Sequence, residues 1–433
     1  MLLIYSPKDS ARLQYVLQLF FNELIKTEYH FTTDQNEFLS SPLPKLNYSK
    51  KKFGNHFFLF AHDLLFEKEI SKQEISVGEY KRIKTIFAHA ELSAIPFDPL
   101  AAAFYLASRY EEYLPFKSDE HGRFPDKESL NYKEKFHEVP VINHYAIFIK
   151  EILLQHYPQL SFLQPSFQFQ LTYDIDFAFA YRNKGLLRTL GGFAKSLFKL
   201  SAKEITGRTN VLLGVKKDPF NTFYFQNALH KKFNLKAIYF FLLGDYGKFD
   251  KNILFTNKEL RALINRISQI NETGIHCSYV SNSFPEKIKT EKARLEKIIG
   301  KNIFRNRQHF LKLSFPFTYQ NLLAAAITED YTMGYASLIG FRAGIASPFF
   351  WYNLAKEETT SLRIFPLAVM DASLFYYQKL NAADAFLKSK QLIDEVKKVN
   401  GYFQFLAHND LLSEENEWKG WREKFEALLA LSS

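Results

Sequence analysis

The sequence predicts an α/β fold in which strands alternate with helices, preceded by a smaller N-terminal region. Three observations support this prediction: apolar strand-like runs separated by helix-like segments from residue 167 onwards, a composition that is 47% hydrophobic and 24% charged, and a length of 433 residues. A chain of this length usually exceeds one ordinary core. We therefore expect a small N-terminal domain and a larger C-terminal domain whose parallel strands form an open sheet or a barrel.

The first 95 residues are expected to form a small α/β or α+β extension domain. The chain opens with the apolar run LLIYS, continues with apolar residues at helical spacing from residue 13 to 24, and has a second strand-like run at 55–66. Residues 96–165 carry helix-like stretches with an apolar stripe and are expected to form a helical connecting region. The N-terminal extension contains no chemical motif of its own.

Residues 166–433 show repeated strand-then-helix units, which imply parallel strands joined by helical crossovers. Thr256 is followed three residues later by Glu259, the spacing of a capping box, so a helix is expected to begin there. The expected strands are 167–174, 236–245, 273–279, 302–310 and 402–408, and the expected helices are 256–270, 285–300, 319–326 and 381–400.

Charge and cysteine content restrict the class of partner. The formal charge of +10 would suit an anionic partner, but Lys and Arg fall in short runs and no nucleic-acid motif is present, so no nucleic acid is expected. Cys277 is the only cysteine, which excludes an intramolecular disulfide and a multi-cysteine zinc site. The sequence has no signal-peptide pattern and no transmembrane segment, so a cytoplasmic location is expected, with peripheral membrane contact left open.

Polar side chains collect where the expected strands end. In parallel α/β folds the carboxyl ends of the strands share one edge, and reactive groups lie there. An aspartate and two histidines around a cavity can hold a zinc-like ion and leave a position for water. Each candidate alone also fits a turn, a cap or a hydrogen-bonded core residue, and their joint placement is what favours a site. The candidates are Asp174, Asp176, His276, Arg307, His309 and His408.

Residues 167–421 resemble the polysaccharide deacetylase family, the carbohydrate esterases with a NodB homology domain, and the upstream part resembles an N-terminal extension found on some bacterial members. The sequence TYDID at 172–176 resembles the opening T-F-D-D motif in a D-x-D variant, and GIHCSYVS at 274–281 resembles the second motif. RNRQHF at 305–310 occupies the place of the Arg-Pro-Pro-Tyr segment, and FLAH at 405–408 matches the closing Leu-x-His motif. The resemblance implies a distorted (β/α) barrel and a hydrolase that removes acetyl groups from a carbohydrate amide or ester.

The resemblance also implies residue roles. It makes Asp174 the general base, Asp176 a metal ligand and His276 the first metal-binding histidine. Arg307 would steady the base, and His408 would be the general acid. The implied cofactor is a divalent metal, with zinc favoured, and the implied partner is an acetylated saccharide or glycan precursor.

One position departs from the family's pattern. The family places a second metal-binding histidine about four residues after the first, and this chain has Val280 there, which cannot ligate. His309 is favoured as the third ligand in its place. Ser278 is the alternative, because on a regular strand it shares the facing of His276.

Three further features concern the surroundings of the site. His408 needs an acceptor on its second ring nitrogen, and Asp330 and Asp371 are both candidates. The loop 244–252 follows a strand and is expected to line the cleft. The aromatic loop SPFFWYN at 347–353 could stack on sugar faces, although core packing is the favoured role for its rings.

Two other functions stay open. Val280 is the main argument for a catalytically inactive glycan-binding relative. A metal-dependent nucleotide-sugar glycosyltransferase would also use the Asp-x-Asp pair, to hold a divalent ion against a diphosphate. That enzyme would not need His276 or His408.

Overall fold

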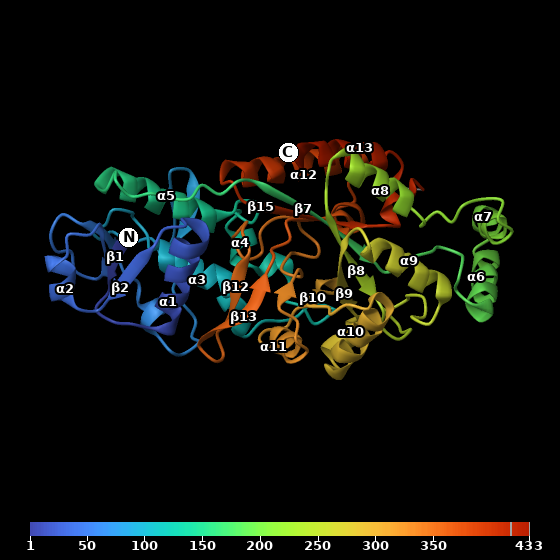
Figure 1. Cartoon of the computed structure of the whole chain (residues 1–433), viewed down its shortest axis with the longest axis horizontal. Helices are drawn as coiled ribbons and strands as arrows, with labels where there is room; N and C mark the ends of the chain where they lie inside the picture. Colours follow the sequence, from blue (N-terminus) through green and yellow to red (C-terminus); the bar gives the residue numbers. More distant parts are fainter. Residues whose placement is uncertain (416–417, 433) are drawn as a thin grey trace.

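The structure, a computed structural model, describes residues 1–415 and 418–432. Two sheets of mainly parallel strands with flanking helices dominate it, a four-stranded sheet at one end and a nine-stranded sheet in the centre (Figure 1). This confirms the α/β class. Within the described residues, no helix combines the length and the apolar character needed to cross a membrane.

The N-terminal sheet is parallel and has the order β2-β1-β3-β4. Helix α3 contacts α1, and α5 contacts β4, so the predicted connecting region packs against this sheet. The division of the chain at residues 95 and 165 stays a prediction. The elements are β1 (Leu2–Tyr5), α1 (Ala11–Leu17), β2 (Tyr29–Thr32), α2 (Gln35–Ser40), β3 (Lys45–Ser49), β4 (Phe57–Phe60), β5 (Val77–Tyr80), β6 (Ile83–Ile86), α3 (Pro99–Ala107), α4 (Leu130–Lys133) and α5 (Val141–His156).

The large sheet is parallel except for its antiparallel β12–β13 pair. In the described residues β12 and β14 are its two edges, so the sheet is open and the closed form of the expected barrel is not shown. In spatial order its strands are β12 (Phe349–Asn353), β13 (Glu358–Ile364), β11 (Glu329–Asp330), β10 (Arg305–Gln308), β9 (Glu272–Cys277), β8 (Ala237–Leu242), β7 (Gln168–Ile175), β15 (Tyr402–His408) and β14 (Val369–Met370).

Helices cover this sheet and connect its strands (Figure 1). All six residues of β8 are buried, as expected for a parallel strand covered on both faces. The N-cap of helix α9 lies one residue later than predicted, because Asn257 rather than Thr256 accepts a hydrogen bond from the Leu260 N–H, and the helix begins at Lys258. The helices are α6 (Leu186–Phe198), α7 (Ala202–Leu212), α8 (Phe223–Lys232), α9 (Lys258–Ser268), α10 (Glu286–Ile299), α11 (Phe317–Ala324), α12 (Ala382–Lys398) and α13 (Trp421–Leu429).

The predicted aromatic loop at 347–353 is wrong, because most of it forms edge strand β12. Phe349, Trp351 and Tyr352 are buried, and the Trp351 ring packs edge-on against Tyr319 with centroids 5.3 Å apart. These rings therefore belong to the core, which was their favoured role.

Buried charges join the N-terminal part of the chain to the large sheet. Arg12 lies 2.6 Å from Glu357, and Glu112 pairs with Arg342 at 2.6 Å and with Arg109 at 2.8 Å. The side chains of Glu112 and both of its arginine partners are almost completely buried. A buried carboxylate held by two guanidinium groups fixes this junction geometrically.

Candidate functional site

The strands that carry the predicted site residues lie close together in the large sheet. Strands β10, β9, β8, β7 and β15 are consecutive and parallel, so their carboxyl ends share one edge. In the strand register Arg307 pairs with His276, and Asp174 pairs with His408. The six predicted residues therefore reach one rim of the sheet, either on these strands or directly after them.

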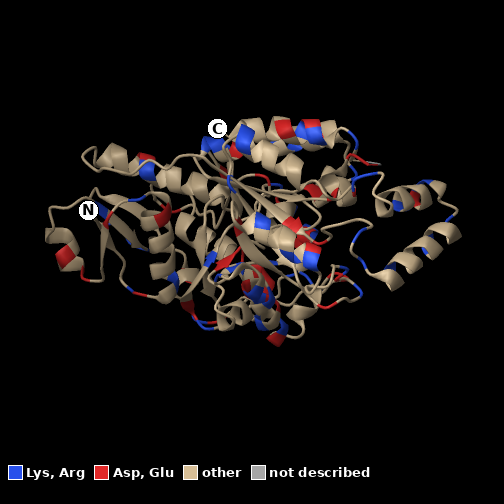
Figure 2. Cartoon of the chain, turned by 45° about the vertical axis from the view of Figure 1, so that its right-hand side comes forward, with Lys and Arg blue, Asp and Glu red and all other residues tan. Residues whose placement is uncertain are grey.

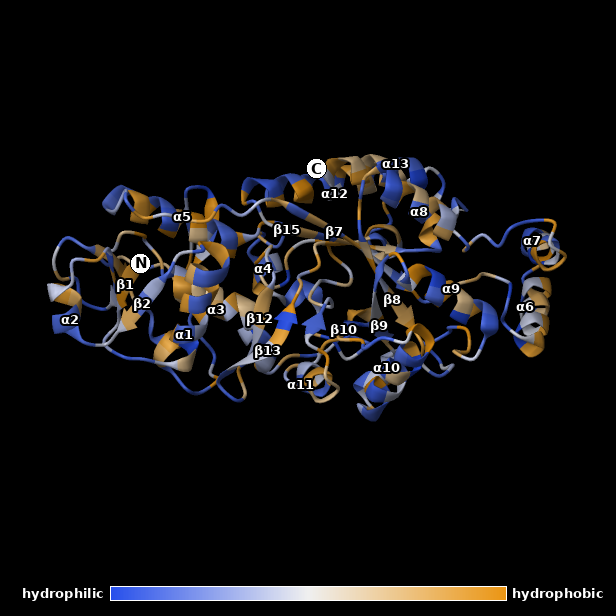
Figure 3. Ribbon diagram, in the orientation of Figure 1, coloured by the Kyte–Doolittle hydropathy of each residue, from blue (hydrophilic) through white to orange (hydrophobic). Residues whose placement is uncertain are grey.

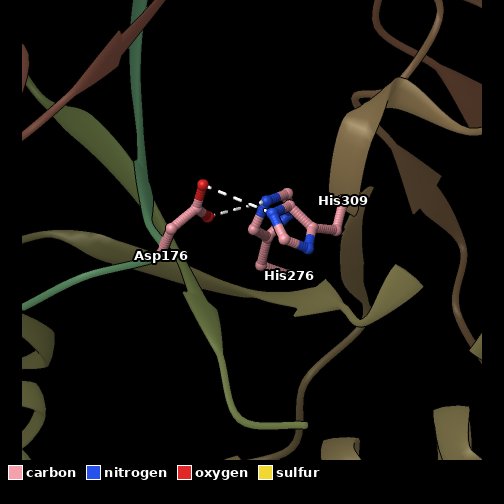
Figure 4. Close-up of side chains that lie close together, drawn as sticks. All are labelled: Asp176, His276 and His309. Carbon is pink, nitrogen blue, oxygen red and sulfur yellow. Dashed lines mark ion pairs between the residues drawn. The ribbon is translucent and has the colours of Figure 1, made fainter. Parts of the chain in front are cut away.

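Asp176, His276 and His309 form a compact cluster (Figure 4). Asp176 Oδ1 lies 3.2 Å from His276 Nε2, and Asp176 Oδ2 lies 3.4 Å from His309 Nε2. One ligand atom from each residue lies within 4.8 Å of the others. Both histidines are buried and Asp176 is partly buried. The structure thus brings His309, the favoured substitute, next to the other two expected ligands.

Hydrogen bonds at the far side of each imidazole fix which nitrogen faces Asp176. His276 Nδ1 lies 2.9 Å from the backbone carbonyl oxygen of Arg307, and His309 Nδ1 lies 2.8 Å from Asp250 Oδ1. Because both partners are acceptors, each Nδ1 carries a hydrogen. Each neutral ring then presents the lone pair of Nε2 to the Asp176 carboxylate, which is also an acceptor. The cluster is electrostatically complete only with a cation or additional protons between these groups.

The distances suit a divalent ion. Neighbouring ligands of a tetrahedral zinc ion, at about 2.0–2.2 Å from the metal, lie roughly 3.4 Å apart. The 3.2 and 3.4 Å separations between Asp176 and the histidines match that spacing. Asp176 Oδ1 is also a buried oxygen without a hydrogen-bond partner in the described residues. The residues present therefore fit a metal with one oxygen and two nitrogen ligands.

Charge coupling within the cluster is strong. Burial raises the pKa of Asp176, but His309 and His276 more than offset it and hold that pKa well below its usual range. Burial lowers the pKa of His309, whereas Asp176 and Asp250 outweigh this and raise it to about 9. Since the same field that favours a proton on His309 favours a metal cation, the cluster attracts positive charge.

Asp174 lies beside this cluster and beside Arg307. Asp174 Oδ2 lies 3.5 Å from His276 Nε2, and Asp174 Oδ1 lies 3.7 Å from an Arg307 terminal nitrogen. The other terminal nitrogen of Arg307 donates to Thr172 Oγ1 at 3.0 Å. Asp174 Oδ1 is buried and lacks a hydrogen-bond partner among the described residues. One Asp174 oxygen therefore has no hydrogen-bond partner among the described residues and lies 3.7 Å from a guanidinium nitrogen.

His408 is oriented by Asp371. Its Nδ1 lies 2.6 Å from Asp371 Oδ1, and its backbone N–H donates to Asp371 Oδ2 at 2.7 Å. Asp330, the other candidate acceptor, instead accepts bonds from Asn306 and Thr332. Burial lowers the pKa of His408, but Asp371 outweighs it, and the pKa rises to about 10.

Sequence reasoning missed the role of Asp250. This residue lies in the loop 244–252, which was expected to line the cleft. Besides contacting His309, Asp250 accepts the backbone N–H of Tyr279 at 2.8 Å and of Val280 at 3.4 Å. Val280, at the position where the resemblance places a second histidine, therefore donates its backbone N–H to Asp250, the aspartate that orients His309.

Ser278 does not take part in the cluster. Its hydroxyl donates to Glu291 Oε1 at 2.5 Å, and its backbone N–H donates to Glu291 Oε2 at 2.9 Å. Cys277, which follows His276 on β9, is buried and does not belong to the cluster of Asp176, His276 and His309. Of the two substitutes considered for the third ligand, the geometry brings only His309 to Asp176.

The chain was compared with family models, curated proteins and solved structures. Residues 2–158 match the model of a family of unknown function, DUF7033. No curated protein matches the chain.

Among solved structures, the chain is similar to a putative polysaccharide deacetylase from Mycobacterium smegmatis, with 14% identity, a TM-score of 0.40, and 62% of this chain and 89% of the other covered. It is also similar to a probable polysaccharide deacetylase from Pseudomonas aeruginosa PAO1, with 10% identity, a TM-score of 0.38, and 60% of this chain and 83% of the other covered. A polysaccharide deacetylase from Bacillus cereus has 13% identity and a TM-score of 0.30, with 62% of this chain and 86% of the other covered. These values are too low to transfer residue roles, so the chemistry of this site rests on its own side chains.

Proposed function

We propose that the chain is a metal-dependent hydrolase that removes acetyl groups from a carbohydrate. The observation that carries this proposal is the position of the Asp176, His276 and His309 cluster. Beside this cluster lies Asp174 Oδ1, at the end of β7, which has no hydrogen-bond partner among the described residues. The His408–Asp371 pair lies at the ends of β15 and β14. A cation site flanked by a proton acceptor and a proton donor is the arrangement that hydrolysis of an acyl bond requires.

The chain's residues have distinct tasks in this reaction. When bound, the divalent ion supplies Lewis acidity toward an acyl carbonyl and lowers the pKa of a water. Asp176, His276 and His309 would hold the ion. Asp174 accepts the proton of the attacking water at its carboxylate, and the buried Arg307 guanidinium lies 3.7 Å from that carboxylate.

His408 donates the second proton. Asp371 holds the hydrogen on Nδ1, so Nε2–H of the imidazolium is the group available to the departing nitrogen or oxygen. Its pKa of about 10 keeps the ring protonated at neutral pH. Proton transfer from His408 prevents the sugar from leaving as an amide or alkoxide anion.

The proposal is tested with the purified, zinc-loaded chain and a panel of N-acetylated and O-acetylated oligosaccharides. Wild type should release acetate from at least one class, and Asp174→Asn should lose roughly 10²–10⁴-fold in rate while retaining zinc. Asp245→Asn is the control, because Asp245 is an exposed acid of the loop 244–252 that pairs with Lys287 and Arg294. Saccharide binding without acetate release would support the inactive glycan-binding alternative.

A second measurement addresses the glycosyltransferase alternative. His276 and His408 are each replaced by Ala, and bound zinc is measured. We expect zinc loss in His276→Ala and zinc retention with lost activity in His408→Ala. Zinc retention after replacement of both histidines would exclude the hydrolase.

A further inference from the structure

A helical hairpin projects from the end of the molecule that lies opposite the N-terminal sheet. Helices α6 and α7 form it, and it stands apart from the body at the right-hand side of Figure 1. It follows directly after β7 and the Asp-x-Asp pair. The proposed reaction assigns it no task.

The hairpin turns an apolar face to solvent. Helix α6 packs its small and polar side on α7: Ser196 Oγ donates to Glu204 at 2.8 Å, and a Cβ added at Gly192 would lie only 2.4 Å from the Arg208 guanidinium. Large apolar side chains of α6 and its C-terminal end are instead 56–91% exposed, and the helix carries orange segments in Figure 3. They are Leu186, Leu187, Leu190, Leu197, Phe198 and Leu200. A soluble surface helix normally buries such a stripe.

The same segment is strongly basic. Residues 182–217 contain nine Lys or Arg and a single Glu, a formal excess of eight positive charges in a chain whose total is +10. Figure 2 shows blue and hardly any red on this projecting pair of helices. Lys195 and Lys199 are exposed within and directly after the helix that carries the apolar stripe. Exposed leucines combined with flanking lysines are typical of helices that lie in the interface of an anionic membrane.

Charge favours a bilayer over a second copy of the chain. Symmetric pairing through the hairpin would bring two segments of eight excess positive charges together, which opposes association. An anionic lipid surface accepts the apolar stripe and neutralises the lysines at the same time. We propose that the α6–α7 hairpin docks on the surface of a bilayer that contains anionic lipid.

The hairpin is fixed to the proposed active site. Arg188 donates to the backbone carbonyl oxygens of Lys251 and Asn252 at 2.8 and 2.9 Å, in the loop whose Asp250 contacts His309. Docking would therefore hold the rim of the large sheet close to the lipid headgroups. If the proposed hydrolase function holds, this docking makes a saccharide carried at a membrane surface the substrate class.

The test measures vesicle binding and needs no catalytic readout. The full-length chain is floated with vesicles of phosphatidylcholine alone and with vesicles that contain phosphatidylcholine and phosphatidylglycerol. We expect binding to the anionic vesicles that is weakened by 0.5 M salt. The triple variant Leu187→Ser, Leu190→Ser, Leu197→Ser and the double variant Lys195→Glu, Lys199→Glu should each lose at least about 10-fold in partitioning.

The matched control replaces three exposed leucines outside the hairpin, Leu92→Ser, Leu163→Ser and Leu387→Ser, and should bind vesicles like wild type. All substitutions affect exposed side chains, so equal melting temperatures would verify folding. Equal vesicle binding by wild type and both hairpin variants would overturn the proposal. The absence of vesicle binding by wild type would also overturn the proposal. Light scattering would then show whether the hairpin instead forms a dimer that the leucine variant dissociates. Failure of acetate release with intact vesicle binding would count against the hydrolase alone.

Discussion

His408 and Asp371 are joined by two contacts at the proposed active site, with Nδ1 2.6 Å from Oδ1 and the backbone N–H of His408 donating to the second carboxylate oxygen. Two bonds from one residue to one carboxylate fix both the ring and its tautomer. His408 ends strand β15 and Asp371 directly follows strand β14, and these two residues meet because the two strands pair in the sheet.

Asp371→Asn should move the alkaline limit of activity to lower pH. Because Asp371 raises the pKa of His408 to about 10, the ring stays protonated as an acid until the pH approaches that value. Without the carboxylate the pKa falls, and the protonated fraction is lost earlier. The rate should drop by roughly 10- to 100-fold at pH 8 and recover in part at lower pH. A pH–rate profile checks this, and an unchanged alkaline limb would contradict the acid role of His408.

Asp250→Asn should weaken metal binding without unfolding the chain. Asp250 orients His309 through Nδ1, and loss of such a supporting carboxylate typically costs ~10–100-fold in metal affinity. Competition with a zinc chelator measures the dissociation constant. Asp245→Asn, in the same loop but away from His309, should bind zinc like wild type, and equal affinities of the two variants would argue against the role of Asp250.

Zinc should stabilise the folded chain. An ion that binds only the native state adds about 2.7 kcal/mol at a concentration 100 times its dissociation constant. Thermal unfolding with and without zinc should show a higher melting temperature for wild type with the metal, reversed by a chelator. His276→Ala and His309→Ala should each show no zinc-dependent shift, whereas a full shift in either variant would place the ion elsewhere.

Glu291 should impose a pH dependence on stability. Burial raises its pKa from 4.5 to about 7, although its hydrogen bonds from Ser278 oppose the shift. The folded chain therefore binds a proton that the unfolded chain releases between these values, so the free energy of unfolding falls as pH rises from about 4.5 to about 7 and then levels off. Glu291→Gln should remove this slope. The pH-dependent part of the free energy of unfolding that it removes is at most about 3 kcal/mol. Denaturant titrations at pH 5 and pH 8 measure it, and parallel curves for the two proteins would refute it.

Glu112→Gln should destabilise the junction between the N-terminal part and the large sheet. The substitution removes the carboxylate that Arg109 and Arg342 share, so the buried Arg342 loses its ion pair with Glu112, while Arg109 keeps Glu111 at 2.7 Å. Breaking a buried pair in this way costs about 3–5 kcal/mol. Denaturant unfolding gives the value, and the exposed pair formed by Lys50 and Asp63 supplies the control, since Asp63→Asn should change stability by less than about 1 kcal/mol. A cost below 1 kcal/mol for Glu112→Gln would show that the stability of the junction does not depend on this carboxylate.

The sequence predicts the rim of the site because parallel strands end at one edge. The alternation in 167–174 and the apolar run before His408 are sufficient to place Asp174 and His408 there, and the structure pairs these two residues in register. The choice of Asp371 over Asp330 and the contact of Asp250 with His309 depend on packing between loops distant in sequence, which local patterns do not encode.

Two predictions failed for local reasons. The aromatic run at 347–353 lacks the alternation of a half-buried strand, because β12 packs nearly all of its residues inside and shifts register between Phe350 and Tyr352. At the start of α9, Asn257 and Thr256 are both good capping residues, and the capping-box spacing alone favoured the wrong one. The family resemblance implied a distorted (β/α) barrel, whereas the described strands form an open sheet with β12 and β14 as its edges.

The most direct measurement of the central claim is a crystal structure of the zinc-loaded chain with anomalous scattering recorded at the zinc edge. One anomalous peak is expected, bonded at about 2.0–2.2 Å to a carboxylate oxygen of Asp176 and to Nε2 of His276 and His309. Loaded crystals with no peak between these three residues, or with an ion held by other side chains, would contradict the metal centre and the hydrolysis derived from it.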